Sequence, residues 1–260
     1  MGKTIVIANQ KGGVGKTTTA INLSAILAHL GNKVLIIDAD PQGNATSGLG
    51  IDKNLNKSLY DVLISDIKLS EVTLKTNVEN LCICPSNIDL AGAEVELVSL
   101  MSREHRLKNK IDEVKNYYDF IIIDCPPSLG LITLNALTAA DSVLIPIQCE
   151  YYALEGLTQL SNTIGLVKQY LNPSLSIEGA VLTMFDSRTK LSNEVVAEVK
   201  NYFKQNVFES IIPRNVKLSE APSFGRSIID YDDTSKGAIA YVELANEIME
   251  KKKDFDEKLN

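Results

Sequence analysis

The sequence predicts an α/β fold in which a doubly wound, mostly parallel sheet carries helices on both faces. First, several apolar runs are continuous rather than alternating, notably FIIID at 120–124 and VLIPI at 143–147, as in strands buried on both faces. Second, such runs alternate along the chain with longer helical patterns, which is the order of an α/β protein. Third, the 260 residues are 45% hydrophobic, which is enough for one large core.

The strands are indicated by short runs rich in valine, isoleucine and leucine. They are expected at residues 4–8, 33–38, 80–84, 119–124, 142–146, 177–184 and 207–212. Helical patterns fill the intervals near residues 16–30, 90–116, 130–140, 153–171 and 190–205, and a last one lies near 235–253. No repeat, low-complexity segment or linker interrupts this order. Residues 1–260 are therefore expected to form a single domain without a separate N-terminal helix-turn-helix domain.

Composition and charge narrow the class of function. The net charge of −7 repels nucleic acid overall, so any DNA binding must come from a local basic patch. The cysteines Cys82, Cys84, Cys125 and Cys149 form no CxxC pair, which argues against a zinc or redox site and favours a reducing cytoplasm. The chain begins with a strand pattern rather than a signal peptide, and no apolar run approaches the ~20 residues needed to cross a membrane. A cytoplasmic protein is expected.

The run KGGVGKTTT at 11–19 follows the first strand and begins the first helix, which is the context of a phosphate-binding P-loop. Its glycines let backbone N–H groups turn toward phosphate oxygens, and the helix N-terminus adds partial positive charge. Lys16 is expected to reach the β- and γ-phosphates, and the Thr17 hydroxyl to coordinate Mg²⁺. The expected nucleotide-binding set is Gly12, Gly13, Val14, Gly15, Lys16, Thr17 and Thr18. The alternative is a glycine-rich turn without a ligand.

Three aspartates follow strands whose carboxyl ends meet at one edge of the predicted sheet. Asp38 and Asp40 end the second strand within DADPQGN, and Asp124 ends FIIID in the form of a Walker B strand. A carboxylate at this edge can hold Mg²⁺ or its waters, or orient a water that attacks the γ-phosphate. We expect Asp38 and Asp124 to lie nearest the metal. The alternatives are a turn that uses the first aspartates and a strand that ends in a capping aspartate.

A guanine nucleotide is disfavoured by the position of its motif. Residues 109–112 read NKID and match the guanine motif N-K-x-D. They precede the Walker B strand and lie in a charged helical pattern, whereas the guanine motif follows Walker B at the end of a later strand. The match is interpreted as accidental, and ATP is expected.

The phosphate motif departs from the ordinary P-loop pattern, and this departure carries a family resemblance. Gln10 stands where the first glycine belongs, and an additional lysine, Lys11, precedes the glycines. This variant resembles the deviant Walker A signature, shared by ParA/Soj partition ATPases, MinD, the arsenical pump ATPase and nitrogenase iron protein. The segments IPRNVKLSEAPSFGRSIIDYD, TSGLGI and LTMFDSRTKLS resemble chromosome-type ParA/Soj proteins in particular, and the likeness runs from residue 3 to about residue 250.

The resemblance implies a P-loop ATPase fold of the deviant Walker A type, with ATP and Mg²⁺ as cofactors. It implies that two copies sandwich two ATP molecules, that Lys11 reaches the partner's nucleotide, and that Asp40 positions the attacking water. It places adenine between the ends of two late strands, where Met184, Pro213 and Asn215 are the expected contacts. The expected catalytic residues are thus Lys11, Lys16 and Asp40.

The resemblance further implies partners and a location. The ATP-bound homodimer is expected to bind double-stranded DNA without sequence preference on the nucleoid, and a ParB/Spo0J-type protein to stimulate its slow hydrolysis. The DNA-binding candidates are Arg188, Lys190, Arg214, Lys217 and Arg226, with Lys236 beside them. Without the resemblance, these residues would instead be interpreted as solvated surface.

A MinD-like ATPase that acts at the membrane in placing cell division is the main alternative. Its mark is a basic amphipathic C-terminal helix. The tail KKKDFDEKLN mixes charges of both signs and has only Phe255 and Leu259 as large apolar residues. Stable membrane association is therefore not expected.

Overall fold

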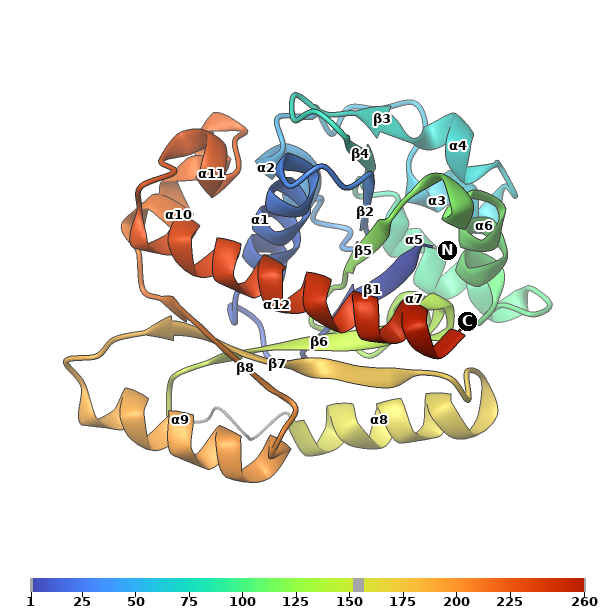
Figure 1. The fold of residues 1–260 in the computed structure, drawn as a ribbon. Helices are drawn as coiled ribbons and strands as arrows, with labels where there is room; N and C mark the ends of the chain where they lie inside the picture. Colours follow the sequence, from blue (N-terminus) through green and yellow to red (C-terminus); the bar gives the residue numbers. More distant parts are fainter. Residues whose placement is uncertain (1, 152–156, 260) are drawn as a thin grey trace.

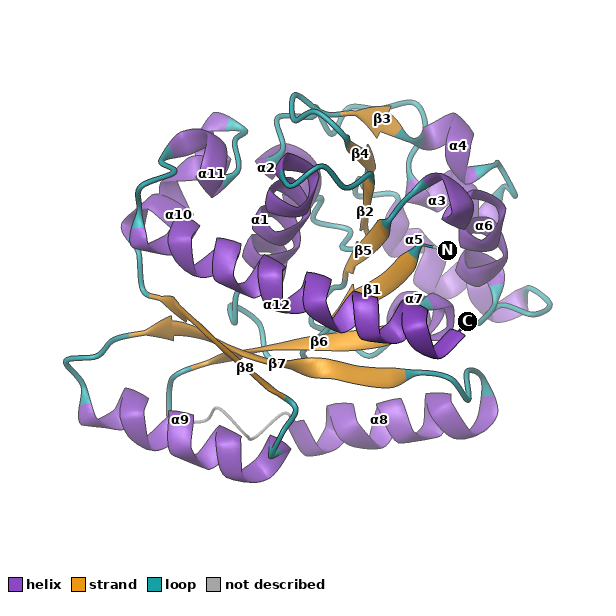
Figure 2. Ribbon diagram, in the orientation of Figure 1, coloured by secondary structure: helices purple, strands orange, loops and turns teal. Residues whose placement is uncertain are grey.

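The computed structural model describes residues 2–151 and 157–259, with side chains for 2–151 and 157–253. Within this part of the chain, one sheet of eight strands lies at the centre, in the order β3-β4-β2-β5-β1-β6-β7-β8 (Figures 1 and 2). The strands are β1 (Lys3–Ile7), β2 (Val34–Asp38), β3 (Leu74–Lys75), β4 (Leu81–Cys84), β5 (Phe120–Asp124), β6 (Ser142–Gln148), β7 (Ser176–Phe185) and β8 (Val207–Pro213). Neighbouring strands are parallel except β3 and β4. The predicted fold class is confirmed.

Helices cover both faces of the sheet (Figure 1). The α-helices are α1 (Lys16–His29), α2 (Asn44–Gly48), α3 (Leu59–Ile64), α4 (Leu69–Val72), α5 (Leu90–Glu96), α6 (Arg106–Val114), α7 (Leu131–Ala139), α8 (Leu157–Tyr170), α9 (Lys190–Phe203), α10 (Val216–Glu220), α11 (Ile228–Tyr231) and α12 (Lys236–Leu259). Short 3-10 helices are η1 (Leu97–Ser99), η2 (Lys115–Tyr117) and η3 (Ala221–Phe224).

The central strands feed two separate hydrophobic cores. In β5, Ile121 and Ile123 face the core under α3–α9, whereas Phe120 and Ile122 face the core under α1, α11 and α12. All residues of β1, β2 and β5 are buried. Successive side chains of a strand point to opposite faces, so a strand with apolar layers on both sides must be apolar at every position. This explains the continuous runs in the sequence.

Two elements differ from the sequence-based expectation. The single helical pattern predicted at 90–116 is wrong, because the structure divides it into α5, η1 and α6. Around the break, the Arg103 guanidinium donates to the Val98 carbonyl oxygen, and Asn135 of α7 accepts from the Leu107 amide and donates to the Arg103 carbonyl oxygen. The two bonds to Asn135 thus satisfy backbone groups within the break and at the start of α6. The two-residue strand β3 was also missed; it pairs antiparallel with β4.

The short helices α2–α4, α10 and α11 were likewise not predicted. The helical pattern expected at 153–171 begins outside the described residues, and its described part forms α8 from Leu157.

What matters for function is the register of the central strands. Ile7 of β1 and Asp38 of β2 are both opposite Asp124 of β5. The loops that follow these three strands therefore leave the sheet side by side, and they build the candidate site.

Candidate functional site

The carboxyl edge of the sheet opens into a cavity of about 730 Å³, a volume within the range of ligand-binding clefts. The loops after β1, β2, β4 and β5 supply most of its walls, together with α5, the start of α7 and the end of β7. The lining residues are Gly12, Gly13, Gly15, Lys16, Thr17, Thr18, Asp40, Pro41, Gln42, Asn44, Ile88, Ala91, Glu94, Pro126, Pro127, Ser128, Ile132 and Met184. Most of the residues predicted from the P-loop motif therefore gather in one place, together with the predicted catalytic aspartate Asp40.

The loop between β1 and α1 has the backbone geometry of a phosphate cradle. Gly13 and Gly15 adopt positive φ angles of 74° and 89°, a conformation that other residues rarely adopt. Val14 does not line the cavity; it is buried, and its carbonyl oxygen accepts a 2.8 Å bond from the Thr183 hydroxyl of β7. With the carbonyl turned toward β7, the loop is fixed by a residue 169 positions away.

Lys16 begins α1 and lies at the floor of the cavity, only 7% exposed. Its Nζ donates a 3.2 Å bond to the Lys11 carbonyl oxygen, which closes the loop on itself. Burial lowers the pKa of Lys16, while the charge of Asp124 acts in the opposite direction. A largely buried ammonium that donates to one carbonyl oxygen can bind a phosphate strongly, because little water has to be removed from it.

Asp38 is more fully occupied than its prediction as a metal residue implied. Its Oδ2 accepts bonds from the Thr46 amide and hydroxyl at 2.8 and 2.7 Å, and its Oδ1 accepts one from the Asp40 amide at 3.2 Å. The Thr46 hydroxyl in turn accepts from the Ser86 amide. Burial raises the pKa of Asp38 to about 6, against the effect of these bonds. The geometry gives Asp38 the task of holding the loop after β2.

Asp124 is the carboxylate that lacks partners. It is fully buried, and neither of its oxygens has a hydrogen bond within the described residues. Burial, and next the charge of Asp38, raise its pKa well above the ordinary value, although the nearby Thr17 hydroxyl offsets part of the rise. A buried carboxylate without a partner is costly, and it fits a metal shell that forms only when nucleotide is bound. Thr17 and Asp124 are thus the residues suited to Mg²⁺, directly or through water.

Asp40 lines the cavity, whereas Lys11 does not line it and directly precedes the lining residue Gly12. The Asp40 Oδ1 accepts from the Gln42 amide, and its Oδ2 has no hydrogen bond to the described residues. The Lys11 backbone is fixed by its amide bond to the Asn9 side chain. Within the described residues, the Lys11 ammonium pairs with no carboxylate. Within the part of the chain that the structure describes, neither charged group is therefore neutralised by an ion pair.

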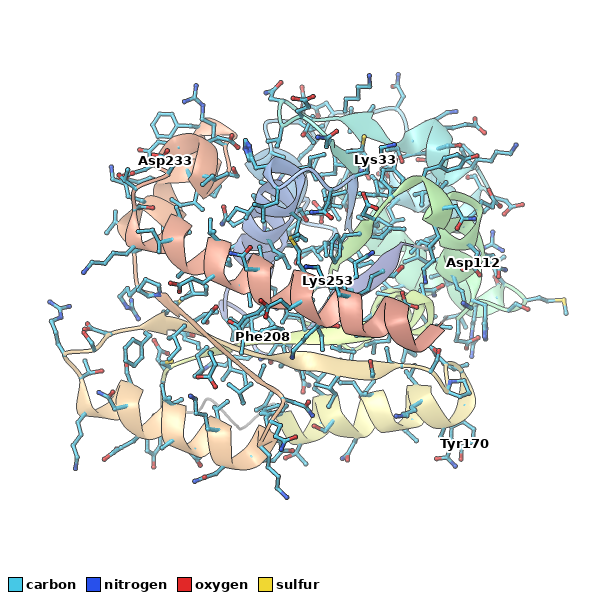
Figure 3. The ribbon with its side chains drawn as sticks, in the orientation of Figure 1. Lys33, Asp112, Tyr170, Phe208, Asp233 and Lys253 are labelled. Carbon is cyan, nitrogen blue, oxygen red and sulfur yellow. The ribbon has the colours of Figure 1, made fainter. Side chains whose placement is uncertain are left out.

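A second cavity of about 320 Å³ adjoins the first through Gly15, Thr18 and Met184. The three residues expected to contact adenine, Met184, Pro213 and Asn215, all line it, with Thr183, Ile212, Arg214, Leu218, Ser219, Pro222 and Tyr241. Met184 has a positive φ of 53°, a strained conformation for a non-glycine residue. The NKID match, by contrast, lies in α6, where Figure 3 shows Asp112 pointing outward. The pocket supports a base site where the ATP interpretation expects one.

Most of the predicted DNA-binding residues are already in local ion pairs. Arg188 pairs with Asp186, Lys190 with Glu194, Arg214 with Glu150 and Lys217 with Glu220. Arg226 has no such partner within the described residues. Arg188 and Lys190 are highly exposed, with side chains 86% and 91% accessible. Exposed pairs of this kind are weak, so they leave these cations available to an anionic ligand.

Sequence reasoning missed several residues that shape the site. Thr46, Thr183 and Glu94 act through contacts with segments far away in the chain. A serine, threonine or glutamate outside a recognised motif gives no local signal of this kind. Among residues 2–151 and 157–259 no helix is long and apolar enough to cross a membrane, and no cluster of three or more His, Cys, Asp or Glu side chains forms a metal site.

The parallel sheet, the glycine cradle with a buried lysine and the unpartnered aspartate opposite it define a P-loop nucleotide-binding protein of the ATPase class. Comparisons with known proteins agree. A family described as "AAA domain" matches residues 2–177. The sporulation initiation inhibitor protein Soj of Bacillus subtilis is 59% identical over 249 residues, covering 95% of this chain and 98% of Soj. The chromosome partitioning protein ParA of Myxococcus xanthus is 58% identical over 252 residues, with coverage of 96% and 89%.

Among solved structures, the cobyrinic acid a,c-diamide synthase of Mycobacterium smegmatis with bound ADP and magnesium has a TM-score of 0.84 and 41% identity, covering 95% of this chain and 93% of that one. The chain belongs to the Soj/ParA family of P-loop ATPases. ATP and Mg²⁺ are its cofactors, as the nucleotide- and magnesium-bound relatives and the unpartnered Asp124 together indicate.

Proposed function

We propose that this chain is a partitioning ATPase that segregates DNA as a nucleotide-controlled switch. In this proposal, ATP brings two copies together as a sandwich dimer, and the dimer binds double-stranded DNA without sequence preference. A centromere-binding protein of the ParB/Spo0J type stimulates slow hydrolysis and releases the dimer. The chain acts as one domain, located in the cytoplasm and on the nucleoid while ATP is bound.

The single observation that supports the proposal most is the arrangement of charge at the phosphate end of the cavity. Lys16, Asp40 and Asp124 are buried there, and Lys11 adds an ammonium that no carboxylate of the described chain neutralises. Lys16 and the loop amides suffice to hold a triphosphate, and bound Mg²⁺ supplies further positive charge to it. Lys11 is therefore surplus to binding within one copy. A second copy's triphosphate is a suitable partner for it.

Hydrolysis is assigned to Asp40. Asp40 lines the cavity. Its amide donates to the Asp38 carboxylate, which fixes its backbone, and its own carboxylate accepts from the Gln42 amide, which fixes its side chain. A fixed carboxylate can hold a water in line with the γ-phosphate. Because none of the binding groups depends on Asp40, hydrolysis is separable from ATP binding.

DNA binding is assigned to the exposed cations of the β7–α9 turn and the α10–α11 segment. Figure 1 shows the β7–α9 turn and α10 toward the same side of the molecule. The net charge of −7 requires such a local surface. Arg226 has no ion-pair partner among the described residues, and Phe224 next to it is 65% exposed. Phosphates can displace the weak local carboxylate partners of the other cations.

The names of the relatives favour partitioning over other ATP-dependent activities. Soj and ParA share 59% and 58% identity with this chain, against 41% for the structure named as a cobyrinic acid a,c-diamide synthase. Residues throughout the chain, rather than the nucleotide site alone, contribute to the two higher values. The proposal therefore takes the activity from these two relatives of higher identity, which match over nearly the full length of the chain.

Retention of double-stranded DNA tests this function. Wild type is expected to bind DNA with Mg–ATP and not with Mg–ADP, and to lose binding steeply as salt rises. Arg188→Glu and Arg226→Glu should each weaken binding roughly fivefold or more, whereas Lys108→Glu on α6 makes the same charge change outside the proposed surface and should not. ATP-dependent binding to anionic vesicles with no DNA binding would instead support the membrane-switch alternative.

A further inference from the structure

Glu94 of α5 makes a contact that neither the family motifs nor the proposed function uses. Its carboxylate accepts hydrogen bonds from the backbone amides of Leu131 at 2.7 Å and Ile132 at 3.2 Å, the first two residues of α7. The residue before α7 is Gly130, which has no side chain to cap the helix. The positive end of α7 is thus capped by a carboxylate from another helix, and a charged acceptor makes such bonds strong.

A glycine is needed at position 130 because a side chain there would clash with Glu94, and not because of its backbone conformation. Its φ of −84° is available to any residue. A Cβ built on it would lie 2.5 Å from each carboxylate oxygen of Glu94. Because the obstacle is the end of a flexible side chain, an added methyl group would push Glu94 aside and leave the backbone in place. The glycine and the glutamate therefore form one unit.

This unit borders the phosphate end of the nucleotide cavity. Asp124 is followed by a loop whose residues Pro126, Pro127 and Ser128 line the cavity, as do Glu94 and Ile132 themselves. The Thr133 hydroxyl of α7 also donates a 2.7 Å bond to the Ser128 carbonyl oxygen. The loop and the first turn of α7 are therefore joined, and the Glu94 contact fixes both to α5.

We propose that Glu94 is a positioning residue for ATP hydrolysis. By capping α7 it sets the position of the 126–128 loop, which lines the cavity together with the glycine cradle. Its carboxylate is engaged by the Leu131 and Ile132 amides, so it acts through α7 rather than on the reacting atoms. Without the cap, the loop no longer holds one position when ATP is bound, so water is aligned less often with the γ-phosphate. The glycine cradle and Lys16, which hold the triphosphate, do not depend on this contact.

Steady-state phosphate release without DNA or any partner tests the inference, which rests on the ATPase part of the proposed function alone. Glu94→Ala should lower kcat about tenfold, as expected for loss of a charge-assisted cap, and leave KM for ATP within about twofold because the cradle is intact. Glu94→Gln keeps an acceptor for only one of the two amides, so its kcat should lie between those of wild type and Glu94→Ala. Glu96→Ala removes the same charge from α5 at a carboxylate bonded to Tyr60 instead, and should match wild type.

Gly130→Ala supplies a second, independent approach to the same contact. It should reproduce the kcat loss of Glu94→Ala, because its methyl group displaces the carboxylate. When Glu94 is already alanine, the obstacle is gone, so adding Gly130→Ala should change kcat less than twofold. Melting temperatures of all variants identify a folding defect. The inference would be overturned if the kcat losses of Glu94→Ala and Gly130→Ala multiply in the double variant, or if Glu94→Ala has the wild-type kcat. A wild-type protein without turnover would instead contradict the ATPase assignment.

Discussion

Replacing Asp124 with asparagine should stabilise the nucleotide-free protein and remove its response to magnesium. Asp124 is fully buried, its two oxygens have no hydrogen-bond partner in the described residues, and Asp38 lies opposite it in the sheet. Both aspartates have pKa values raised by burial. Without nucleotide, the folded protein is therefore destabilised by a buried carboxyl group that is suited to a metal ion. Asparagine keeps the size of the side chain and removes the charge.

The size and the pH dependence of the effect follow from this burial. Removing one buried, unpaired charge gives about 1–3 kcal/mol, which corresponds to roughly 2–6 °C in Tm for a chain of this length. The folded-state pKa of Asp124 is raised, so ionisation favours the unfolded chain once pH exceeds the ordinary value of 3.8. The advantage of Asp124→Asn should therefore vanish near pH 4, grow as pH rises toward the folded-state pKa, and be fully present above it.

Thermal melts at pH 4 to 8, with nucleotide alone and with nucleotide plus Mg²⁺, measure both effects. Wild type should gain additional stability from Mg²⁺, and Asp124→Asn should not. Asp233→Asn makes the same substitution on an exposed residue at the surface (Figure 3) and should behave as wild type. The reasoning is refuted if Asp124→Asn melts at or below the wild-type temperature at pH 8 and still responds to Mg²⁺.

Two further predictions separate the roles of the charged groups at the phosphate end. Lys11→Ala should keep the ATP affinity of one copy within about threefold, because Lys16 and the loop amides remain, but it should not dimerise with ATP. Fluorescent-nucleotide titration measures the affinity, and light scattering measures the dimer. A normal dimer would exclude the role assigned to Lys11. Asp40→Ala should slow hydrolysis by ~10²-fold or more and retain or increase ATP affinity. Radiolabelled ATP should therefore persist in its complex for hours. Turnover at the wild-type rate would mean that another group positions the water.

The parts of the site that the sequence predicted are those encoded by contiguous residues. The glycine cradle with Lys16 and Thr17, and the strand that ends in Asp124, are each built within one short segment, and their positions relative to one another follow from the rule that parallel strands end at one edge. Burial on both faces made β1, β2 and β5 visible as apolar runs. The rule that parallel strands end at one edge also gave the expected position of the cavity.

The parts that it did not predict depend on contacts between distant segments. Thr183 reaches the cradle across 169 positions, and Glu94 reaches α7 across 37. The bonds from Thr46 give Asp38 an additional role in holding the loop after β2, and its role at the metal stays a prediction. The helix expected over 90–116 is interrupted, and Asn135 of the distant helix α7 bonds to the Arg103 carbonyl oxygen within the break and to the Leu107 amide at the start of α6. Local patterns carry no record of which distant partner will occupy a polar group.

The mass of the full-length chain in solution with Mg–ATP and with Mg–ADP tests the central claim most directly. Size-exclusion chromatography with light scattering measures it without any assumption about partner or cargo. The proposed switch predicts twice the monomer mass with ATP, most clearly for Asp40→Ala, and the monomer mass with ADP, because only the triphosphate offers Lys11 of the other copy a γ-phosphate to bind. The same mass with both nucleotides, for wild type and for Asp40→Ala, would contradict the claim that ATP controls assembly.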